Sequence, residues 1–360
     1  MIRIWPGIVE RYVGRHVAVW VIYVSLFLCL ISWLIKFMEQ LRYVGTGTFT
    51  VITAVESVTM LIPHNFYTFF PLSALMGTVV ALCLLSSRSE LVVLQASGVS
   101  KLMIVTAAMK MVLPLMLGVI LLGEFVVPYT SFKYDEIRAQ AIKGVTISPG
   151  ITGDLWAREN NEFFYMSQAS AEGELRNVEK FTFDPDSGKL LSHSVAEGAV
   201  FQDGVWQFHD ITSRIFREDG FDLLHEDSAQ WQLTITPDKF NIFSNSPDEL
   251  SIHGLYSYLR YLKKNHLKAD RYELEFWRKT LSPFAVITMI FLASTVAFGS
   301  MRSLSLSSRI VLGIVYGFVF YVANQTFSPM SLVFGIQPFV CVILPSALFF
   351  MAAVFMLARR

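Results

Sequence analysis

The chain has 360 residues, of which 53% are apolar and only 16% are charged, whereas an average soluble protein is roughly 25% charged. The formal net charge of zero hides an uneven distribution, because residues 129–272 carry 22 acidic and 15 basic side chains and the remainder carries 7 and 14. These values exclude a single soluble globule, a disordered chain and a nucleic-acid-binding protein, whose binding domain would be basic, and they favour an integral membrane protein with one water-exposed domain.

Uncharged apolar stretches define the membrane part, because crossing about 30 Å of hydrocarbon takes roughly 20 helical residues. The stretch from Ile310 to Ala358 carries no charge and is too long for one span, so the prolines, glycine and serines of 328–338 are expected to divide it. In chain order, the six predicted spans are Val17–Ile35, Asn65–Ser87, Leu102–Val127, Thr280–Met301 and the two halves of Ile310–Ala358.

Basic residues in the short loops predict the orientation, because Lys and Arg are enriched in cytoplasmic loops. One side of the predicted topology holds Arg3, Arg11, Arg15, Arg88, Lys101, Arg302, Arg309, Arg359 and Arg360, whereas the short loops of the other side offer little beyond Arg42. We therefore expect both termini in the cytoplasm and residues 129–272 outside. The first span is too long for the apolar part of a signal peptide and is expected to remain as an anchor.

The outside domain reads as short runs of alternating apolar and polar residues separated by turn signals such as Asp186-Ser187-Gly188, Asp203-Gly204 and Asp219-Gly220. The expected strands are Glu162–Ser170, Leu175–Asp184, Lys189–Phe201, Val205–Phe216 and Asp222–Leu233. They predict an antiparallel β-sandwich or jelly roll with one buried face. That face is either an ordinary core, which the pattern favours, or a groove for acyl chains.

The predicted organisation therefore has four parts. They are residues 1–128 with spans one to three, 129–250 with the β domain, 251–279 with two connecting helices (Ser251–Lys264 and Arg271–Lys279), and 280–360 with spans four to six. The fold class is an α-helical integral membrane protein with six transmembrane helices and an outside antiparallel β domain.

Common catalytic and nucleotide-binding motifs are missing from the sequence. It contains no G-x-x-x-x-G-K-[ST], no H-E-x-x-H and no G-x-S-x-G. Cys29, Cys83 and Cys341 all fall in predicted spans, and no Cys/His group has metal-ligand spacing. We expect no catalytic residue, cofactor or metal in this chain.

The loop between spans two and three, residues 87–100, predicts a short amphipathic helix. Glu90 suits its first turn, Leu91 and Leu94 share one face, and Gly98 is a typical stop. The residues alone leave two interpretations open. The helix either rests on lipid or acts as a coupling helix that docks on a cytoplasmic motor.

Lys36 is an unusual charge near the outer end of span one, since a lysine in a span costs about 2.5–3.5 kcal/mol at the centre and less near an end. It can snorkel, pair with Glu39 three residues on, or bind an anionic group of a substrate. Lys110 and Glu124 in span three have no assigned role: Lys110 can snorkel inward, and Glu124 can pair with Lys36 or cap a neighbouring helix.

The run Ser89-Glu-Leu-Val-Val-Leu-Gln-Ala-Ser-Gly98 closely resembles the coupling-helix motif of the LptF/LptG family of lipopolysaccharide-export permeases. Further matching stretches are Ile35-Lys-Phe37, Gln40-Leu41, Arg138-Ala-Gln-Ala141, Leu155-Trp-Ala157, Leu233-Thr-Ile-Thr-Pro-Asp-Lys239 and Gly317-Phe-Val-Phe-Tyr-Val322. The resemblance covers nearly the whole chain, including six spans and an outside β domain between spans three and four.

The resemblance implies a permease subunit of an ATP-driven ABC transporter that extracts lipopolysaccharide from the outer leaflet of a Gram-negative inner membrane. It implies as partners an LptF-like permease, an LptB-like ATPase dimer that binds ATP and Mg²⁺, an LptC-like single-span protein and an LptA-like periplasmic bridge. The β domain would be periplasmic, and the chain would not itself be an enzyme. The residues alone leave open a motor-independent lipid scramblase and a membrane-anchored periplasmic scaffold.

The resemblance also implies roles for single residues. Lys36 matches a lysine that binds lipid A phosphates. Arg42 matches the first residue of a basic pair that follows it, and Tyr43 stands in place of the second. Arg138 matches a further basic position, although the acidic residues Asp135 and Glu136 stand beside it. Spans one and five are expected to form the apolar wall of a substrate cavity, with Phe27, Tyr316, Phe320 and Tyr321 as candidate lining residues. The residues expected to couple to the ATPase are Arg88, Glu90, Leu91, Leu94 and Gly98.

Overall fold

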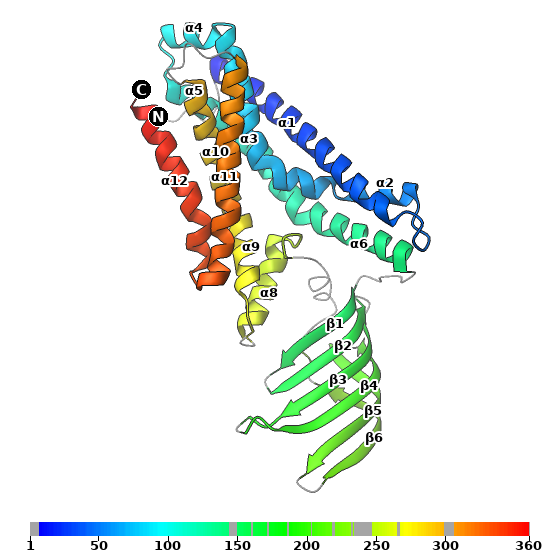
Figure 1. Ribbon diagram of the computed structural model, residues 1–360. Helices are drawn as coiled ribbons and strands as arrows, with labels where there is room; N and C mark the ends of the chain where they lie inside the picture. The colour runs from blue at the N-terminus through cyan, green and yellow to red at the C-terminus, as the bar shows by residue number, and fades with distance from the viewer. Residues whose placement is uncertain are drawn as a thin grey trace. The chain divides into compact units, whose positions relative to one another are not determined.

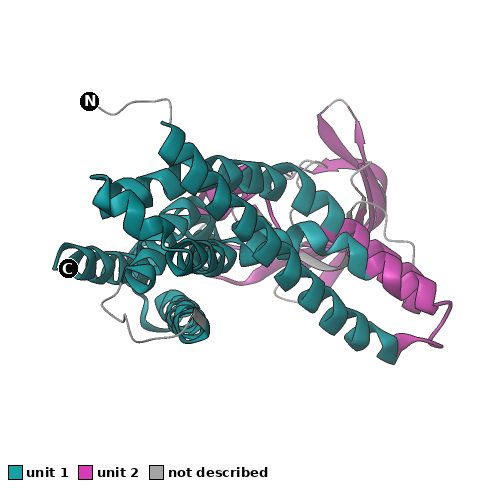
Figure 2. Ribbon diagram, turned by 90° about the horizontal axis from the view of Figure 1, so that it is seen from above, with its two compact units in different colours: residues 1–42, 58–130, 270–360 teal, residues 43–57, 131–269 magenta. Residues whose placement is uncertain are grey.

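The computed structural model describes residues 7–143, 150–159, 161–170, 173–185, 187–202, 204–217, 220–231, 233, 247–264, 267–298 and 306–359. The chain divides into two compact units, coloured separately in Figure 2. Unit 1 comprises residues 1–42, 58–130 and 270–360, and unit 2 comprises residues 43–57 and 131–269. Unit 1 is helical, whereas unit 2 contains the β-sheet.

The helices follow one another as labelled in Figure 1. They are α1 (Ile8–Gln40), the 3-10 turn η1 (Leu41–Tyr43), α2 (Val51–Met60), α3 (Ile62–Ser87), α4 (Glu90–Ala96), α5 (Lys101–Leu121), the π-helical turn η2 (Leu122–Val126), α6 (Val127–Lys143), α8 (Ile252–Lys264), α9 (Asp270–Thr280), α10 (Ser282–Ala297), α11 (Leu306–Phe334) and α12 (Pro338–Ala358).

The predicted set of membrane spans is confirmed within the described residues. Five helical segments are long and apolar enough to cross a membrane, and the pair α9–α10, bent by 50°, brings the number to six if it is counted as one span. The long uncharged stretch is divided between Phe334 and Pro338, inside the predicted window. Two segments are longer than predicted: α1 begins at Ile8, and the third span continues through η2 and α6 to Lys143.

Helix α3 forms the centre of unit 1. Of its most apolar window, 61% is buried inside the chain, compared with 17% for α1 and for α11. One apolar cluster joins α3 to α1, α5 and α10, and a second joins it to α10, α11 and α12. The outer faces of α1 and α11 therefore present large apolar side chains to the surroundings, as expected for surfaces that contact lipid or another membrane chain.

Two glycines allow α1 to approach its neighbours closely. A Cβ atom at Gly77 of α3 would lie 2.5 Å from the Cα atom of Val21, and one at Gly14 of α1 would lie 2.6 Å from the carbonyl oxygen of Ala107 in α5. Small residues at such positions let the backbones of membrane helices meet. Helix α1 is thereby held against α3 and α5 by direct backbone contact.

Unit 2 contains one antiparallel sheet whose strands keep their sequence order (Figure 1). The strands are β1 (Gly150–Glu159), β2 (Glu162–Ser170), β3 (Glu174–Phe183), β4 (Leu190–Gln202), β5 (Val205–Arg217) and β6 (Gly220–Trp231). The five predicted strands match β2 to β6 within two residues, and β1 is additional. Of the predicted turn residues, Gly188, Gly204 and Gly220 adopt positive φ, whereas Asp186, Asp203 and Asp219 lie outside the described residues.

The sheet has one face filled by its own side chains. Phe164, Met166, Phe208 and Ile211 are fully buried there. The ring of Trp231, at the end of β6, lies 4.3 Å from that of Phe208 on β5 and 6.2 Å from that of Phe164 on β2. The sheet therefore curls so that its last strand closes over its second, and this face is an ordinary core in the part of the chain that the structure describes.

The close contact at Gly77 makes a direct prediction for stability. Gly77→Ala places a methyl group against the backbone of Val21 and is expected to lower the free energy of unfolding by about 1–3 kcal/mol, as overpacking does elsewhere. The melting temperature of the detergent-solubilised protein measures this loss. Gly118→Ala is the matched control, because a Cβ atom at Gly118 meets nothing within 4 Å and alanine favours a helix. Equal melting temperatures for the two variants would contradict the assignment of Gly77 as a packing contact.

Candidate functional site

Helix α4 stands between α3 and α5 at the position where the sequence predicted a short helix. Leu91 is only 2% exposed and packs in the cluster that joins α1, α3 and α5, and Leu94 packs against the same cluster. Val92 and Val93 are 63% and 65% exposed. The two leucines thus attach α4 to its own chain, and the two valines, which the sequence analysis did not single out, form the apolar surface that remains open.

The ends of α4 are fixed by backbone geometry. Ser89 precedes the helix in a left-handed conformation (φ 62°), and exposed Arg88 follows the last turn of α3. Gly98 has φ 91° and its amide donates to the carbonyl of Gln95 at 3.0 Å, so the helix ends where the sequence predicted a stop. Ser100 then starts α5 by accepting a hydrogen bond from the amide of Met103 at 3.2 Å.

Glu90, the first residue of α4, has a partner far away in the sequence. The hydroxyl of Tyr12 in α1 donates a hydrogen bond to Oε2 of Glu90 at 2.7 Å. The sequence analysis identified Glu90 but not Tyr12. Only the packing of α1 beside α4 brings the two side chains together.

A second polar contact ties α1 to α5. The ammonium group of Lys110 lies 2.9 Å from Oε2 of Glu10 and 3.0 Å from Oε1, and the amide of Gly7 donates to the same carboxylate at 3.1 Å. Both side chains of the ion pair are largely buried. Lys110, which the sequence left without an assigned role, therefore neutralises an acidic residue at the beginning of α1.

The basic residues predicted near the outer end of α1 belong to different units. Lys36 forms the predicted pair with Glu39, at 3.1 Å, and both side chains are about half exposed. Arg42 is exposed in η1. In unit 2, the guanidinium of Arg138 lies 5.3 Å from the ring centres of Tyr43 and Tyr134. Tyr43 thus contacts a cation of its own unit.

The π-helical turn η2 contains Glu124 beside a polar cluster of unit 1. A Cβ atom at the neighbouring Gly123 would touch the ring of Tyr67, and the ammonium of buried Lys279 lies 5.3 Å from the centre of that ring. Lys279 closes α9 just before the 50° bend. The sequence analysis placed Lys279 at the end of a connecting helix without anticipating its burial.

The four candidates for the cavity wall have different surroundings. Phe27 in α1 and Tyr321 in α11 are exposed, Tyr316 is half-buried, and Phe320 is buried against Phe349 of α12 with their ring centres 5.3 Å apart. The hydroxyl oxygen of Tyr321 accepts a hydrogen bond from the side-chain amide nitrogen Nε2 of Gln325 at 3.1 Å. Of the four residues predicted to line a substrate cavity, Phe27 and Tyr321 are therefore the two whose side chains are exposed.

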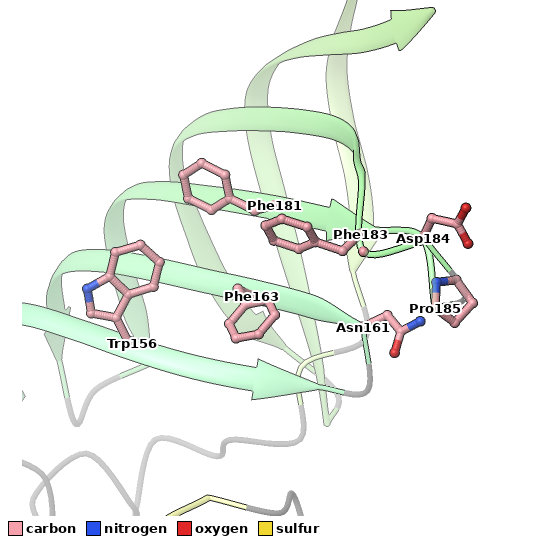
Figure 3. Close-up of a pocket in the computed structure, with 8 residues that line it drawn as sticks. Trp156, Asn161, Phe163, Phe181, Phe183, Asp184 and Pro185 are labelled. Carbon is pink, nitrogen blue, oxygen red and sulfur yellow. The ribbon is translucent and has the colours of Figure 1, made fainter.

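Unit 2 contains an aromatic pocket of about 610 Å³. Figure 3 shows that Trp156, Phe163, Phe181 and Phe183 line it, with Asn161 and Asp184 at its edge. Phe163 pairs directly with Phe181 across β2 and β3, and it points away from its buried neighbour Phe164 because successive strand residues face opposite sides. This pocket therefore lies on the face of the sheet opposite to the buried one.

Among the described residues, no group of three His, Cys, Asp or Glu side chains is placed to hold a metal ion. The three cysteines are free and buried in α1, α3 and α12. The candidate site consists of the ends of α1, the loop around α4 and the exposed faces of α1 and α11.

Comparison with known proteins places these features in one family. The family model described as the lipopolysaccharide export system permease LptF/LptG matches residues 11–359. The lipopolysaccharide export system permease protein LptG of Escherichia coli strain K12 is 34% identical, over 98% of this chain and 99% of its own length. The protein of the same name from Haemophilus influenzae is also 34% identical, over 98% of each chain.

The ion pair between Glu10 and Lys110 is expected to stabilise unit 1. Lys110→Met leaves a largely buried carboxylate without its cation and is expected to lower the melting temperature by about 2–4 °C. The double variant Glu10→Gln/Lys110→Met should lose less than the sum of the two single variants, because the unpaired charge is gone. Arg217→Met, which removes a fully exposed pair with Asp222, is the control and should change little. Strict additivity of the two single effects would show that the pair contributes nothing.

Proposed function

Because the chain belongs to the LptF/LptG family of lipopolysaccharide export permeases, we propose that it is a permease subunit of an ATP-driven transporter. This transporter extracts lipopolysaccharide from the outer leaflet of the bacterial inner membrane and passes it to a periplasmic bridge. The observation that carries the proposal is the family match over residues 11–359, which includes the spans, the α4 loop and the β domain together.

The proposed orientation places the α4 end of unit 1 in the cytoplasm. The Tyr12–Glu90 contact brings the beginning of α1 to this end, and a hydrogen bond from Arg309 to Ser86 at 3.2 Å brings the beginning of α11 there. The basic residues that gather with these elements are Arg11, Arg15, Arg88, Lys101 and Arg309. An excess of Lys and Arg on one side is typical of cytoplasmic loops, and this orientation puts the β domain in the periplasm.

The motor is proposed to be a separate ATPase dimer that binds ATP and Mg²⁺ and docks on the α4 loop. The sequence of this chain has no phosphate-binding loop, so the energy must come from a partner. Exposed Val92 and Val93 offer the docking partner an apolar surface, and Arg88 and Glu90 beside them offer charges of both signs. Leu91, Leu94 and Gly98 act indirectly, since they fix α4 to the chain.

The outer end of α1 is proposed to bind the phosphates of the substrate. The ion pair of Lys36 with Glu39 is exposed, and exposed pairs contribute little, so a phosphate can take the place of the carboxylate at small cost. Arg42 is exposed and retains donors for an anion. For Arg138 of unit 2 only the resemblance supports a phosphate role, because its Nε atom is buried.

The apolar faces of α1 and α11 are proposed to enclose the acyl chains together with a second permease of the same family. Phe27 and Tyr321 lie on these faces, where most large side chains are exposed. A single chain leaves both faces open, so a cavity requires a partner. A single-span protein and a periplasmic bridge complete the proposed assembly, as the resemblance implies.

The coupling role of Glu90 can be tested by charge reversal. Glu90→Arg is expected to reduce both co-purification of the ATPase and lipopolysaccharide export by at least about tenfold, because one lost charged contact in an interface costs 2 kcal/mol or more. A pull-down of the tagged chain and an assay of lipopolysaccharide release measure the two effects. Glu56→Arg is the control, since Glu56 is exposed on α2 and carries the same charge change. Normal ATPase binding and export by Glu90→Arg would show that α4 is not the coupling element.

The phosphate role of Lys36 makes a separate prediction. Lys36→Asp is expected to weaken lipopolysaccharide binding by about three- to tenfold, because an attractive charge becomes repulsive, whereas Lys36→Arg should retain binding. Photo-crosslinking of lipopolysaccharide to a probe at exposed Met38 in α1 measures the occupancy. Undiminished crosslinking in Lys36→Asp would remove Lys36 from the substrate site.

A further inference from the structure

We propose that Tyr12 is a positioning residue that holds Glu90 and joins helix α4 to helix α1, so that movement of α4 is transmitted along α1 to the outer end of the membrane part. This inference rests on the proposed function, in which an ATPase acts on α4. It assigns a role to a side chain that does not itself touch nucleotide or lipid.

The Tyr12–Glu90 contact is suited to fix α4 in place. Its O···O distance of 2.7 Å is typical of a hydrogen bond from a hydroxyl to an ionised carboxylate, which is stronger than a bond between neutral groups. Helix α4 has only seven residues, and isolated helices of this length are not stable in water. Its position therefore depends on side-chain contacts, of which Leu91 and Leu94 supply apolar ones and Glu90 a polar one. The ring of Tyr12 stacks on that of His16 one turn later, which orients the hydroxyl.

The contact occupies one oxygen of Glu90 and leaves room for a partner. Tyr12 bonds Oε2, and both side chains lie at an exposed position on the chain. A cationic side chain of the motor can approach Oε1 without breaking the contact to Tyr12. Glu90 then bonds the motor and α1 at the same time, so a pull on α4 reaches α1 directly.

The beginning of α1 is also clamped to the helix that follows α4. Glu10 pairs with Lys110 of α5, and the backbone of α1 at Gly14 meets the carbonyl of Ala107. The first two turns of α1 thus contact α4 through Tyr12 and α5 through Glu10 and Gly14. Helix α1 and the α4 loop therefore form one packed body at the proposed cytoplasmic end.

Helix α1 is built to carry such a movement across the membrane. It is a continuous helix of 33 residues, which corresponds to a length of about 50 Å. It contains no proline, whereas each of the other four described segments that can span a membrane as one helix has at least one proline beyond its first turn, among them Pro71, Pro114, Pro329 and Pro345. Because prolines kink helices, α1 is expected to bend less than the other spans. Along α1, Lys36 lies about 36 Å from Tyr12.

The variant Tyr12→Phe tests the proposal, because it removes one hydroxyl and keeps the ring that stacks on His16. The complex of the chain with its ATPase and second permease is reconstituted in proteoliposomes, and ATP hydrolysis and lipopolysaccharide release are measured together. We expect ATPase binding to persist and the amount of lipopolysaccharide released per ATP to fall about three- to tenfold. Tyr129→Phe is the matched control, since Tyr129 is an exposed tyrosine of α6, away from both α4 and the exposed face of α1, and should leave this ratio unchanged.

A second variant separates positioning from simple loss of structure. If Tyr12 acts through Glu90, adding Tyr12→Phe to Glu90→Gln should lower the ratio no further than Glu90→Gln alone. An unchanged ratio in Tyr12→Phe, or an additive loss in the double variant, would overturn the inference while the wild-type complex continued to support the proposed function. A wild-type complex that hydrolyses ATP without releasing lipopolysaccharide would overturn the proposed function, and the inference with it.

Discussion

The close backbone contact of α1 with α3 and α5 is the interaction on which the helical unit depends. Lipid offers little apolar driving force for helix association, so backbones must meet directly, and Gly77 and Gly14 permit this. Once α1 is fixed there, Glu10 reaches Lys110 and Tyr12 reaches Glu90. The same contact leaves the opposite face of α1 apolar and exposed. One helix thus connects the proposed motor site, the proposed lipid-facing wall and the proposed phosphate-binding end at Lys36.

Most of the fold could be predicted from the sequence because its patterns are strong and local. Uncharged stretches located the spans, and alternation located β2 to β6 within two residues. The misses have physical reasons. Strand β1 was not predicted because Gly150, Gly153 and Asp154 are residue types typical of turns. The beginning of α1 was placed too late because Glu10, Arg11 and Arg15 interrupt the uncharged stretch that was used to define the span. The break between α9 and α10 lies next to Pro283 in the first turn of α10, and the sequence pattern did not predict its 50° angle.

The candidate site could be predicted only in part, because its partners are far apart in the chain. Glu90 was identified from the α4 motif, but Tyr12 lies 78 residues away and no local pattern joins them. The same holds for Lys110 and Glu10, which are 100 residues apart. The pair of Lys36 with Glu39 was foreseen, since three residues in a helix bring two side chains to one face. Val92 and Val93 are exposed because Leu91 occupies the buried face of α4 and the next two residues of the helix turn away from that face.

The proposed role of this chain as the membrane part of a motor-driven lipid extractor is tested most directly by the composition of the native complex. The tagged chain would be purified in mild detergent from its native membrane, and the bound proteins and lipids would be identified by mass spectrometry. We expect an ABC ATPase, a second permease of the same family and a phosphorylated, multiply acylated glycolipid. Recovery of the chain alone with ordinary phospholipid would contradict the claim and would favour a scramblase or a scaffold that needs no motor.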